Sequence, residues 1–407
     1  MKKKETALLL ILALVQFTNV IDFMIVMPLG PVLKNLWKID STQFSRVVSL
    51  FSIGAFISAM ACIAFVDRFD RKKILLTVYA GFTIGTFLCG LSQTYYQLLA
   101  ARFVTGLFGG IGGSVILSMV GDYVATERRG QAMGILMTGF SLASILGVPG
   151  GLWLAGHYQW HTPFIVLASL CTAVFMLAFF LVPSFTGHLK NGVVKQSAYT
   201  IIKNIFSDVK KRWALLLALF LIMSHFSIIP FLTDFFTNNL GINYKTDVPL
   251  IYIFGGILTV FVSPLIGKLS DKHGRLFIFS ILTVLAMVPL LAIPNIYTSN
   301  FWIILPICCT LFIFSGSRMI IGSAQITSTA TPQERGSFMI VNSSIQQLGT
   351  GLMAAIGGAI ITNDEAQRVI HYPILGFIGV AFAILAYLVF RKITKDNIKS
   401  SSVKMEG

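Results

Sequence analysis

Five ionisable side chains stand in strongly apolar parts of this 407-residue chain: Asp22, Arg102, His225, Asp234 and Arg318. A charge in the middle of a membrane-spanning segment costs at least about 2.5–3.5 kcal/mol, so each of them must face a polar cavity or a partner. A carboxylate there can take up and release a proton, an imidazole titrates near neutral pH, and a guanidinium can bind an anion. These residues are therefore the first candidates for carrying protons or a charged ligand.

Asp22 lies on a polar stripe of its segment. Gln16, Asn19 and Asp22 follow one another at three-residue spacing, which places them on one side of a helix. Asp22 is about 22 Å into its apolar stretch at 1.5 Å per residue. We expect Asp22 to be the proton-coupling site, balanced between burial, which favours the neutral acid, and an approaching Arg102, which favours the carboxylate. The alternatives are a structural hydrogen-bond partner for the proline-containing segment that follows, and a direct contact with a substrate.

Each of the other four residues also has two interpretations. Arg102, about 8 Å from the end of its segment, either serves proton transfer or substrate binding, or extends its side chain to the membrane surface. Asp234 either faces a cavity or lies at the interface. Arg318 is about 27 Å from the outer end of its segment, where it could bind an anionic substrate group or form a salt bridge. His225 is either a proton relay or a polar side chain with its hydrogen bonds satisfied.

The composition indicates which elements position these residues. The chain is 55% hydrophobic and 12% charged, with a mean hydropathy of +0.81. These values exclude a soluble enzyme, a disordered protein and a receptor with one anchor, and the strands of a membrane barrel would dilute the apolar content. We predict an all-α membrane protein with twelve transmembrane helices. The predicted spans are 7–33, 45–66, 74–92, 97–124, 131–156, 162–182, 213–238, 247–266, 276–294, 300–326, 336–362 and 371–390.

The net charge of +15 has a topological explanation. With the N-terminus in the cytoplasm, 24 of the 31 Lys and Arg residues fall on the cytoplasmic side of the predicted spans, as the positive-inside rule requires. Both termini are therefore expected to be cytoplasmic, and no nucleic-acid partner is needed to explain the charge. The five cysteines form no CxxC pair, and His157 and His161 have no third ligand beside them, so no metal site is predicted.

The chain divides into two halves joined by a basic linker. Residues 1–182 and 213–391 hold six spans each, residues 183–212 form the linker, and residues 392–407 form a tail. Asp67 and Asp271 stand in matching loops 204 positions apart, and Gly130 and Gly336 in a second pair of loops are 206 positions apart. Similar offsets at two places indicate duplicated halves of parallel orientation, a type of repeat found in transporters.

Four groups of residues carry a resemblance to a known family. The loop after span 8 reads Gly267 to Arg275, and the loop after span 2 keeps its charges but has Ile63 and Asp70 where the pattern has glycines. With Arg102 and the glycines that follow it in span 4, these loops resemble those of the major facilitator superfamily across essentially all twelve spans. Span 5 is similar to the Gly-Pro motif of the drug/proton antiporter branch of bacterial efflux permeases, although Val148 separates the glycine from the proline. The span-5 residues are Gly139, Gly147, Pro149, Gly150 and Gly151.

This resemblance implies roles for the loops and for span 5. The loop charges would latch neighbouring helices and close the cytoplasmic side, although short cytoplasmic loops are basic in any case. The residues of this cytoplasmic gate are Asp67, Arg68, Arg71, Lys72, Asp271, Lys272, Gly274 and Arg275. Span 5 would be a bent hinge at a moving interface between the halves, or else a static packing seam.

The sequence thus leads us to expect a secondary active transporter that works by alternating access. Because nothing in the chain resembles an ATP-binding module, we expect a proton gradient and no cofactor to drive antiport that exports small, amphiphilic molecules. A proton-linked carrier of a polar metabolite, sugar or siderophore is the alternative, and a transport-inactive sensor is the alternative of another class. An enzyme is not expected, because no catalytic constellation lies at one membrane depth. We expect a monomer in the bacterial inner membrane.

Overall fold

A computed structural model describes residues 3–65, 69–124, 128–184, 197–331 and 334–403, and these residues are almost entirely helical. The first half contains α1 (Lys3–Ile25), η1 (Met27–Leu29), α2 (Gly30–Trp37), α3 (Ser41–Phe65), α4 (Arg71–Leu91), α5 (Tyr95–Tyr123), α6 (Arg129–Leu142), η3 (Ala143–Gly147), α7 (Val148–His157) and α8 (Thr162–Leu181). After α10 (Ala198–Ser207), the second half contains α11 (Val209–His225), α12 (Ile229–Asn238), α13 (Asp247–His273), α14 (Arg275–Ala292), η4 (Ile293–Asn295), α15 (Phe301–Thr327), α16 (Arg335–Ile360), the strands β1 (Thr362–Asn363) and β2 (Val369–Ile370), and α17 (Tyr372–Val403).

The predicted fold class is confirmed. In the described part of the chain, ten helices or runs of helices are long and apolar enough to cross a membrane. The two other predicted spans are also helical. Span 5 is divided into α6, η3 and α7, and span 11 is the continuous helix α16, whose apolar character is diluted by Asn342, Ser343, Ser344, Gln346 and Gln347.

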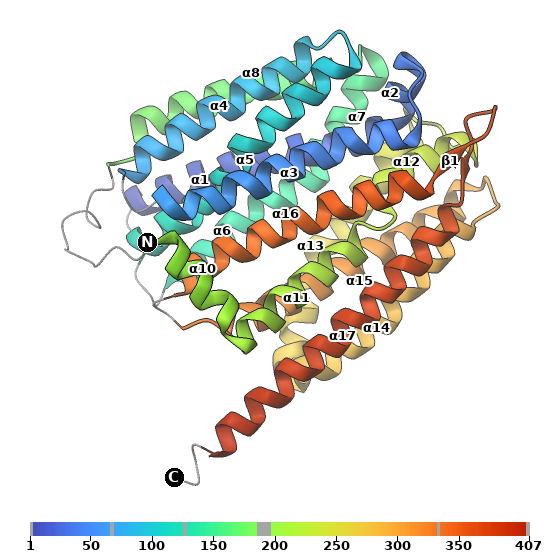
Figure 1. Ribbon diagram of the computed structural model, residues 1–407. Coiled ribbons are helices and arrows are strands. Elements are labelled where there is room, and N and C mark those ends of the chain that lie inside the picture. Colours follow the sequence, from blue (N-terminus) through green and yellow to red (C-terminus); the bar gives the residue numbers. More distant parts are fainter. Residues whose placement is uncertain (1–2, 66–68, 125–127, 185–196, 332–333, 404–407) are drawn as a thin grey trace.

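The helices form two groups that lie side by side in Figure 1, one from each half of the sequence. We call the end of the bundle that carries β1 and β2 the hairpin end, and the opposite end, where α1 begins and α10 lies, the linker end. The halves contact each other where α3 packs on α16, where α13 packs on η3 and α7, and where α12 packs on η1 and α2. The contacts of α12 with η1 and α2 lie at the hairpin end.

The first and seventh spans are both broken toward the hairpin end, which the hydropathy pattern did not predict. The first span divides into α1, η1 and α2, where Pro28 and Pro31 lie in the first turns of the short helices. The seventh divides at Phe226, and Pro230 lies in the first turn of α12. Proline lacks the N–H that would continue the preceding helix but fits well in a first turn, so each break follows from the sequence.

The fifth span is interrupted as its proline predicts. Pro149 cannot donate a backbone hydrogen bond to the preceding turn, and that turn, Ala143–Gly147, is a π-helix. Its glycines pack on the first span, because a side chain at Gly139, Gly147 or Gly151 would collide with α1 of the same half. Ile145, beside Gly256 of α13, makes the contact with the other half, and Gly150 faces open space. The hinge role of this span stays a prediction.

Candidate functional site

An ion pair between Asp22 and Arg102 lies in the core of the first half. The Nη1 atom of Arg102 on α5 is 2.6 Å from the Oδ2 atom of Asp22 on α1, and it also donates to the Asp22 carbonyl oxygen at 3.2 Å. Neither side chain is exposed. Arg102 therefore turns into the protein instead of extending to the membrane surface, which was the alternative interpretation.

Side chains from two further helices complete the surroundings of this pair. Thr86 on α4 donates to the Oδ1 atom of Asp22 at 3.0 Å, so both carboxylate oxygens accept a hydrogen bond. The ring of Phe51 on α3 lies 4.3 Å from the Arg102 guanidinium carbon, a cation–π arrangement. The Asp22 carboxylate is thus fixed by an ion pair with Arg102 and by a hydrogen bond from Thr86. A proton added to it would compete directly with Arg102 for the same oxygen atoms.

The two other polar residues of the first span have different surroundings. Asn19 donates from Nδ2 to the carbonyl oxygen of Gly109 on α5 at 3.0 Å. It also lines a small cavity together with Tyr79, Phe82 and Phe108. Gln16 is half-buried, and its side chain makes no hydrogen bond within the described residues. Asn19 and Asp22 therefore both face α5, one at a backbone carbonyl and the other at a guanidinium.

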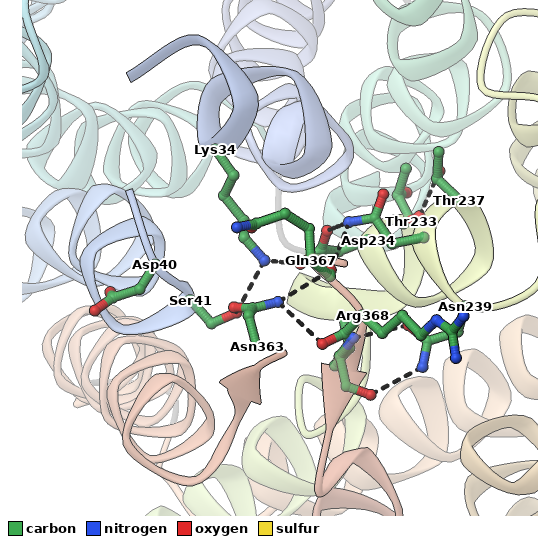
Figure 2. Close-up of polar contacts among 12 residues, drawn as sticks. Lys34, Asp40, Ser41, Thr233, Asp234, Thr237, Asn239, Asn363, Gln367 and Arg368 are labelled. Carbon is green, nitrogen blue, oxygen red and sulfur yellow. Dashed lines mark hydrogen bonds and ion pairs between the residues drawn. The ribbon is translucent and has the colours of Figure 1, made fainter. Parts of the chain in front are cut away.

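A second buried ion pair joins the two halves at the hairpin end (Figure 2). The Nζ atom of Lys34 on α2 is 2.5 Å from the Oδ2 atom of Asp234 on α12, and it also donates to the Ser41 hydroxyl at 3.1 Å. The Lys34 side chain is 1% exposed and that of Asp234 is 0% exposed. Asp234 is therefore removed from the water interface, where one interpretation of the sequence placed it.

Neutral side chains extend this pair into a network across the halves. The Ser41 hydroxyl on α3 donates to the Oδ1 atom of Asn363 on β1 at 2.7 Å. Asn238 donates to the Oδ1 atom of Asp234 at 2.7 Å and to the carbonyl oxygen of Gln367, between the two strands, at 3.1 Å. The network therefore connects α2 and α3 of the first half with α12 and the hairpin of the second half, as Figure 2 shows.

Lys34 is the functional residue that the sequence analysis missed. The predicted first span ends at residue 33 and leaves Lys34 outside it, whereas α2 continues to Trp37 and buries the lysine. One signal could have identified it. Lys34 is one of few basic residues on a side of the membrane that the positive-inside rule otherwise keeps free of them.

Arg318 and His225 lie together in the second half. Arg318 on α15 is 2% exposed and has no ion-pair partner among the described residues, and its Nε and Nη2 atoms are buried without a hydrogen bond. α11 packs on α15, and Leu221 of α11 faces Gly322 of α15. His225 and Arg318 each lie one turn from this contact, and the Nδ1 atom of His225 is also buried without a partner among the described residues. Of the two interpretations of Arg318, the salt bridge is not seen among the residues described.

With this geometry in place, comparison with known proteins identifies the family. The model of the Major Facilitator Superfamily matches residues 12–321, which is most of the chain. The chain belongs to this superfamily. Among curated relatives, the uncharacterized MFS-type transporter YceJ of Bacillus subtilis is 24% identical over 398 residues, covering 96% of this chain and 97% of the relative. The probable sugar efflux transporter of Helicobacter pylori strain P12 is 23% identical and covers 92% of each chain.

Solved structures of other superfamily members have the same fold at low sequence identity. A D-xylose–proton symporter superposes with a TM-score of 0.76 at 14% identity, covering 94% of this chain and 97% of that one. The human organic anion transporter MFSD10 superposes with a TM-score of 0.73 at 13% identity, covering 96% and 100% of the two chains. These similarities show a multi-pass membrane transporter fold, and they indicate no catalytic family.

The superfamily's loop signature lies at the linker end. Of its first copy, Asp67 and Arg68 lie outside the described residues, and Arg71 is buried. Asp70, which replaces a glycine of the pattern, caps α4 by accepting from the backbone N–H of Lys72 at 2.9 Å, and it also accepts from the Ser184 hydroxyl. Lys72 itself lies 5.9 Å from the ring of Phe179. The first copy thus ties α4 to the last residues of the sixth span.

The second copy of the signature is more open. Arg275 and Asp271 approach to 4.0 Å, and their side chains are 43% and 75% exposed, so the contact is a weak surface pair. Lys272 is exposed, and Gly274 turns the chain between α13 and α14 with a φ of 92°, a conformation that favours glycine. The latch that the superfamily resemblance implies stays a prediction, because the described contacts of Asp271 and Arg275 stay within one loop.

Proposed function

We propose that this superfamily member is a proton-coupled antiporter that exports small, amphiphilic molecules by alternating access. The observation that carries the proposal is the buried Asp22–Arg102 pair, with its 2.6 Å contact at membrane depth. An ionisable carboxylate is costly in this place, and a carrier that cycles protons has a use for it. Protonation of Asp22 would remove its charge and release Arg102, so proton binding and the position of α1 against α5 are coupled.

The Lys34–Asp234 network would be the closure of the pathway at the hairpin end. By the distribution of basic residues, we assign this end to the outside of the cell and the linker end to the cytoplasm. The two broken spans meet here, because α2 and α12 are the short helices that carry Lys34 and Asp234. Opening toward the outside would separate these helices, and hydration of the two charges would offset part of the lost attraction.

The comparisons leave the cargo and its direction open. Relatives include a probable sugar efflux transporter and a gallate transporter, and one similar structure is a sugar–proton symporter. Proton-linked uptake of a polar metabolite, sugar or siderophore is therefore the alternative that the test must separate from antiport. We propose that the protein acts as a monomer in the bacterial inner membrane and exports its cargo from the cell.

The test is proton movement in proteoliposomes that enclose a pH-sensitive dye. A panel of anionic, neutral and cationic amphiphiles is added outside, with and without an imposed pH gradient. Antiport predicts that entry of the substrate makes the interior more alkaline, whereas symport would make it more acidic. Asp22→Asn should abolish the coupled proton movement. Asp40→Asn should not, because Asp40 is an exposed carboxylate that caps α3. Substrate flux that is indifferent to the pH gradient would refute proton coupling, and no flux at all would favour the sensor.

A further inference from the structure

The buried charges of the two halves are unequal. In the described interior of the bundle, Arg102 is neutralised by Asp22, and Lys34 is neutralised by Asp234. Arg318 has no such partner among the residues described. Away from the ends of its apolar segments, the second half contains one carboxylate in the sequence, Asp234, and it is already used at the hairpin end. The second half therefore holds a positive charge that none of the described residues compensates.

The surroundings of Arg318 strengthen its attraction for an anion. It is the eighteenth residue of the 27-residue helix α15, far from the hairpin end. Its guanidinium carbon lies 5.8 Å from the centroid of the Phe279 ring, which stacks on Phe390 at 4.1 Å, and neither ring is exposed. In such apolar surroundings an approaching anion is attracted much more strongly than it would be in water. A guanidinium with free nitrogen atoms also matches the planar, two-oxygen geometry of a carboxylate.

A row of aromatic rings leads from this charge toward the first half. His225 contacts the Phe226 ring, with centroids 5.1 Å apart, and Phe226 meets Phe23 of α1 at 5.7 Å. Phe23 in turn lies 5.6 Å from Phe51, the ring beneath Arg102. The rings belong to both halves, so a molecule held against them would be contacted by both. They suit an apolar or aromatic body.

We propose that Arg318, with His225 as a second donor, binds the carboxylate of an amphiphilic organic anion whose apolar body lies along Phe226 and Phe23. The inference rests on the proposed transport function and names the class of cargo. Arg318 supplies the charge and the two-pronged hydrogen bond. His225, whose Nδ1 atom is buried without a partner among the described residues, supplies a hydrogen bond when that atom carries a proton. The anion completes the charge balance that the second half lacks.

Binding is tested at equilibrium on the purified protein in lipid nanodiscs, without a pH gradient. All five native cysteines are buried, so a thiol-reactive dye reports unfolding. The probes are benzoate, benzamide and benzylamine, and the matched cyclohexane carboxylate, carboxamide and methylamine, all at constant ionic strength. The carboxylates should raise the unfolding temperature, and the matched amides and amines should not. Equal effects of the anion and the amine would overturn the proposal.

Variants then attribute the binding to Arg318. Arg318→Met should bind benzoate at least about tenfold more weakly, which is the usual effect of losing a charge-assisted hydrogen bond. Arg318→Lys should bind with intermediate affinity, because it keeps the charge and loses the planar fork. Arg391→Met, at an exposed arginine in the second part of α17, should bind as the unmodified protein does. Unchanged benzoate affinity in Arg318→Met would contradict the assignment.

The unfolding temperature of the protein without ligand distinguishes a binding arginine from a structural one. Because Arg318 is a buried charge without a partner among the described residues, Arg318→Met should unfold at the same temperature as the unmodified protein or at a higher one. A clearly lower unfolding temperature would make Arg318 a structural residue and overturn the proposal. Since none of these measurements uses a proton gradient, failure of proton coupling in proteoliposomes and failure of anion binding are separate results.

Discussion

The Lys34–Asp234 pair allows a quantitative prediction about closure of the hairpin end. Lys34→Met leaves Asp234 with the Asn238 amide alone, at 2.7 Å, while Asp234→Asn leaves the lysine without a counter-charge and beside the Ser41 hydroxyl at 3.1 Å. Each single change strands one buried charge. The double variant, Lys34→Met with Asp234→Leu, removes both charges together and leaves neither stranded.

The magnitude follows from the burial of the pair. Removing one partner of a buried ion pair costs about 3–5 kcal/mol, most of it from the uncompensated charge that remains. This cost applies to the closed hairpin end, since separation of the halves would let water reach the charge. The ratio of closed to open molecules should therefore fall by a factor of about 140 to 4,000. The double variant should recover most of that loss, because no charge stays buried.

The assay uses a cysteine that the closed halves protect. Ser45 on α3 is 2% exposed and faces Gly358 of α16 across the interface. In a background without the five native cysteines, Ser45→Cys should react slowly with a membrane-impermeant maleimide. The labelling rate should rise at least about tenfold with Lys34→Met or Asp234→Asn, and should fall again in the double variant. Lys38→Met, at an exposed lysine that follows α2, is the matched control.

Two outcomes would refute this reasoning. If folded Lys34→Met and Asp234→Asn proteins are labelled no faster than the parent, the pair does not hold the hairpin end closed. If the double variant is labelled as fast as the single variants, the cause is loss of contact between α2 and α12 and not a stranded charge. Circular dichroism of each variant establishes that the helices are intact before labelling.

Two further predictions concern the linker end and the fifth span. Lys211 donates to Glu334 at 2.7 Å, and this hydrogen bond lowers the pKa of Glu334 below its usual 4.5. The stabilisation is therefore present at neutral pH and is lost as the pH falls through that lowered pKa, so the unfolding temperatures of the unmodified protein and Glu334→Gln should converge below about pH 4.5. With Glu334 44% exposed, the difference at pH 7 should stay below about 1 kcal/mol, and a constant difference across the range would contradict the assignment. Gly151→Leu should destabilise the protein by at least about 1–3 kcal/mol through collision with Ile25, while Gly150→Leu, facing open space, should change thermal stability little. Equal losses in the two leucine variants would show that helix packing on α1 is not the cause.

The sequence predicts the helices well because membrane burial acts on every residue in the same way. An apolar stretch of about 20 residues must be a helix wherever it stands, so the span positions follow from local composition. The proline breaks near Pro28, Pro149 and Pro230 are local too. The hydropathy pattern does not predict the hairpin of β1 and β2, because its strands have two residues each and depend on Asn239, the residue after α12, which exchanges hydrogen bonds with Val369.

Local sequence patterns do not show which residues far apart in the chain will pair. The desolvation cost of a charge identifies Asp22, Arg102 and Asp234 as residues that need partners, without naming the partner. Lys34 and Asp234 are 200 positions apart and meet because η1 and α2 turn the chain toward α12. In the same way, the glycines of span 5 indicate close packing, and the structure alone places α1 against them.

The two halves carry different buried charges, and this asymmetry supports separate roles for them in the proposed proton coupling and anion binding. At the 206-residue spacing of the repeat, Arg102 corresponds to Cys308 and Arg318 corresponds to Gly112. One half therefore contains a closed acid–base pair, and the other contains a cation that an external anion can neutralise. In the transport cycle that we propose, the Lys34–Asp234 pair that joins the halves would break and re-form each time the hairpin end opens. A buried ion pair suits repeated opening, because the cost of desolvating Lys34 and Asp234 cancels much of their attraction. The closed state is therefore not made so stable that it could not open.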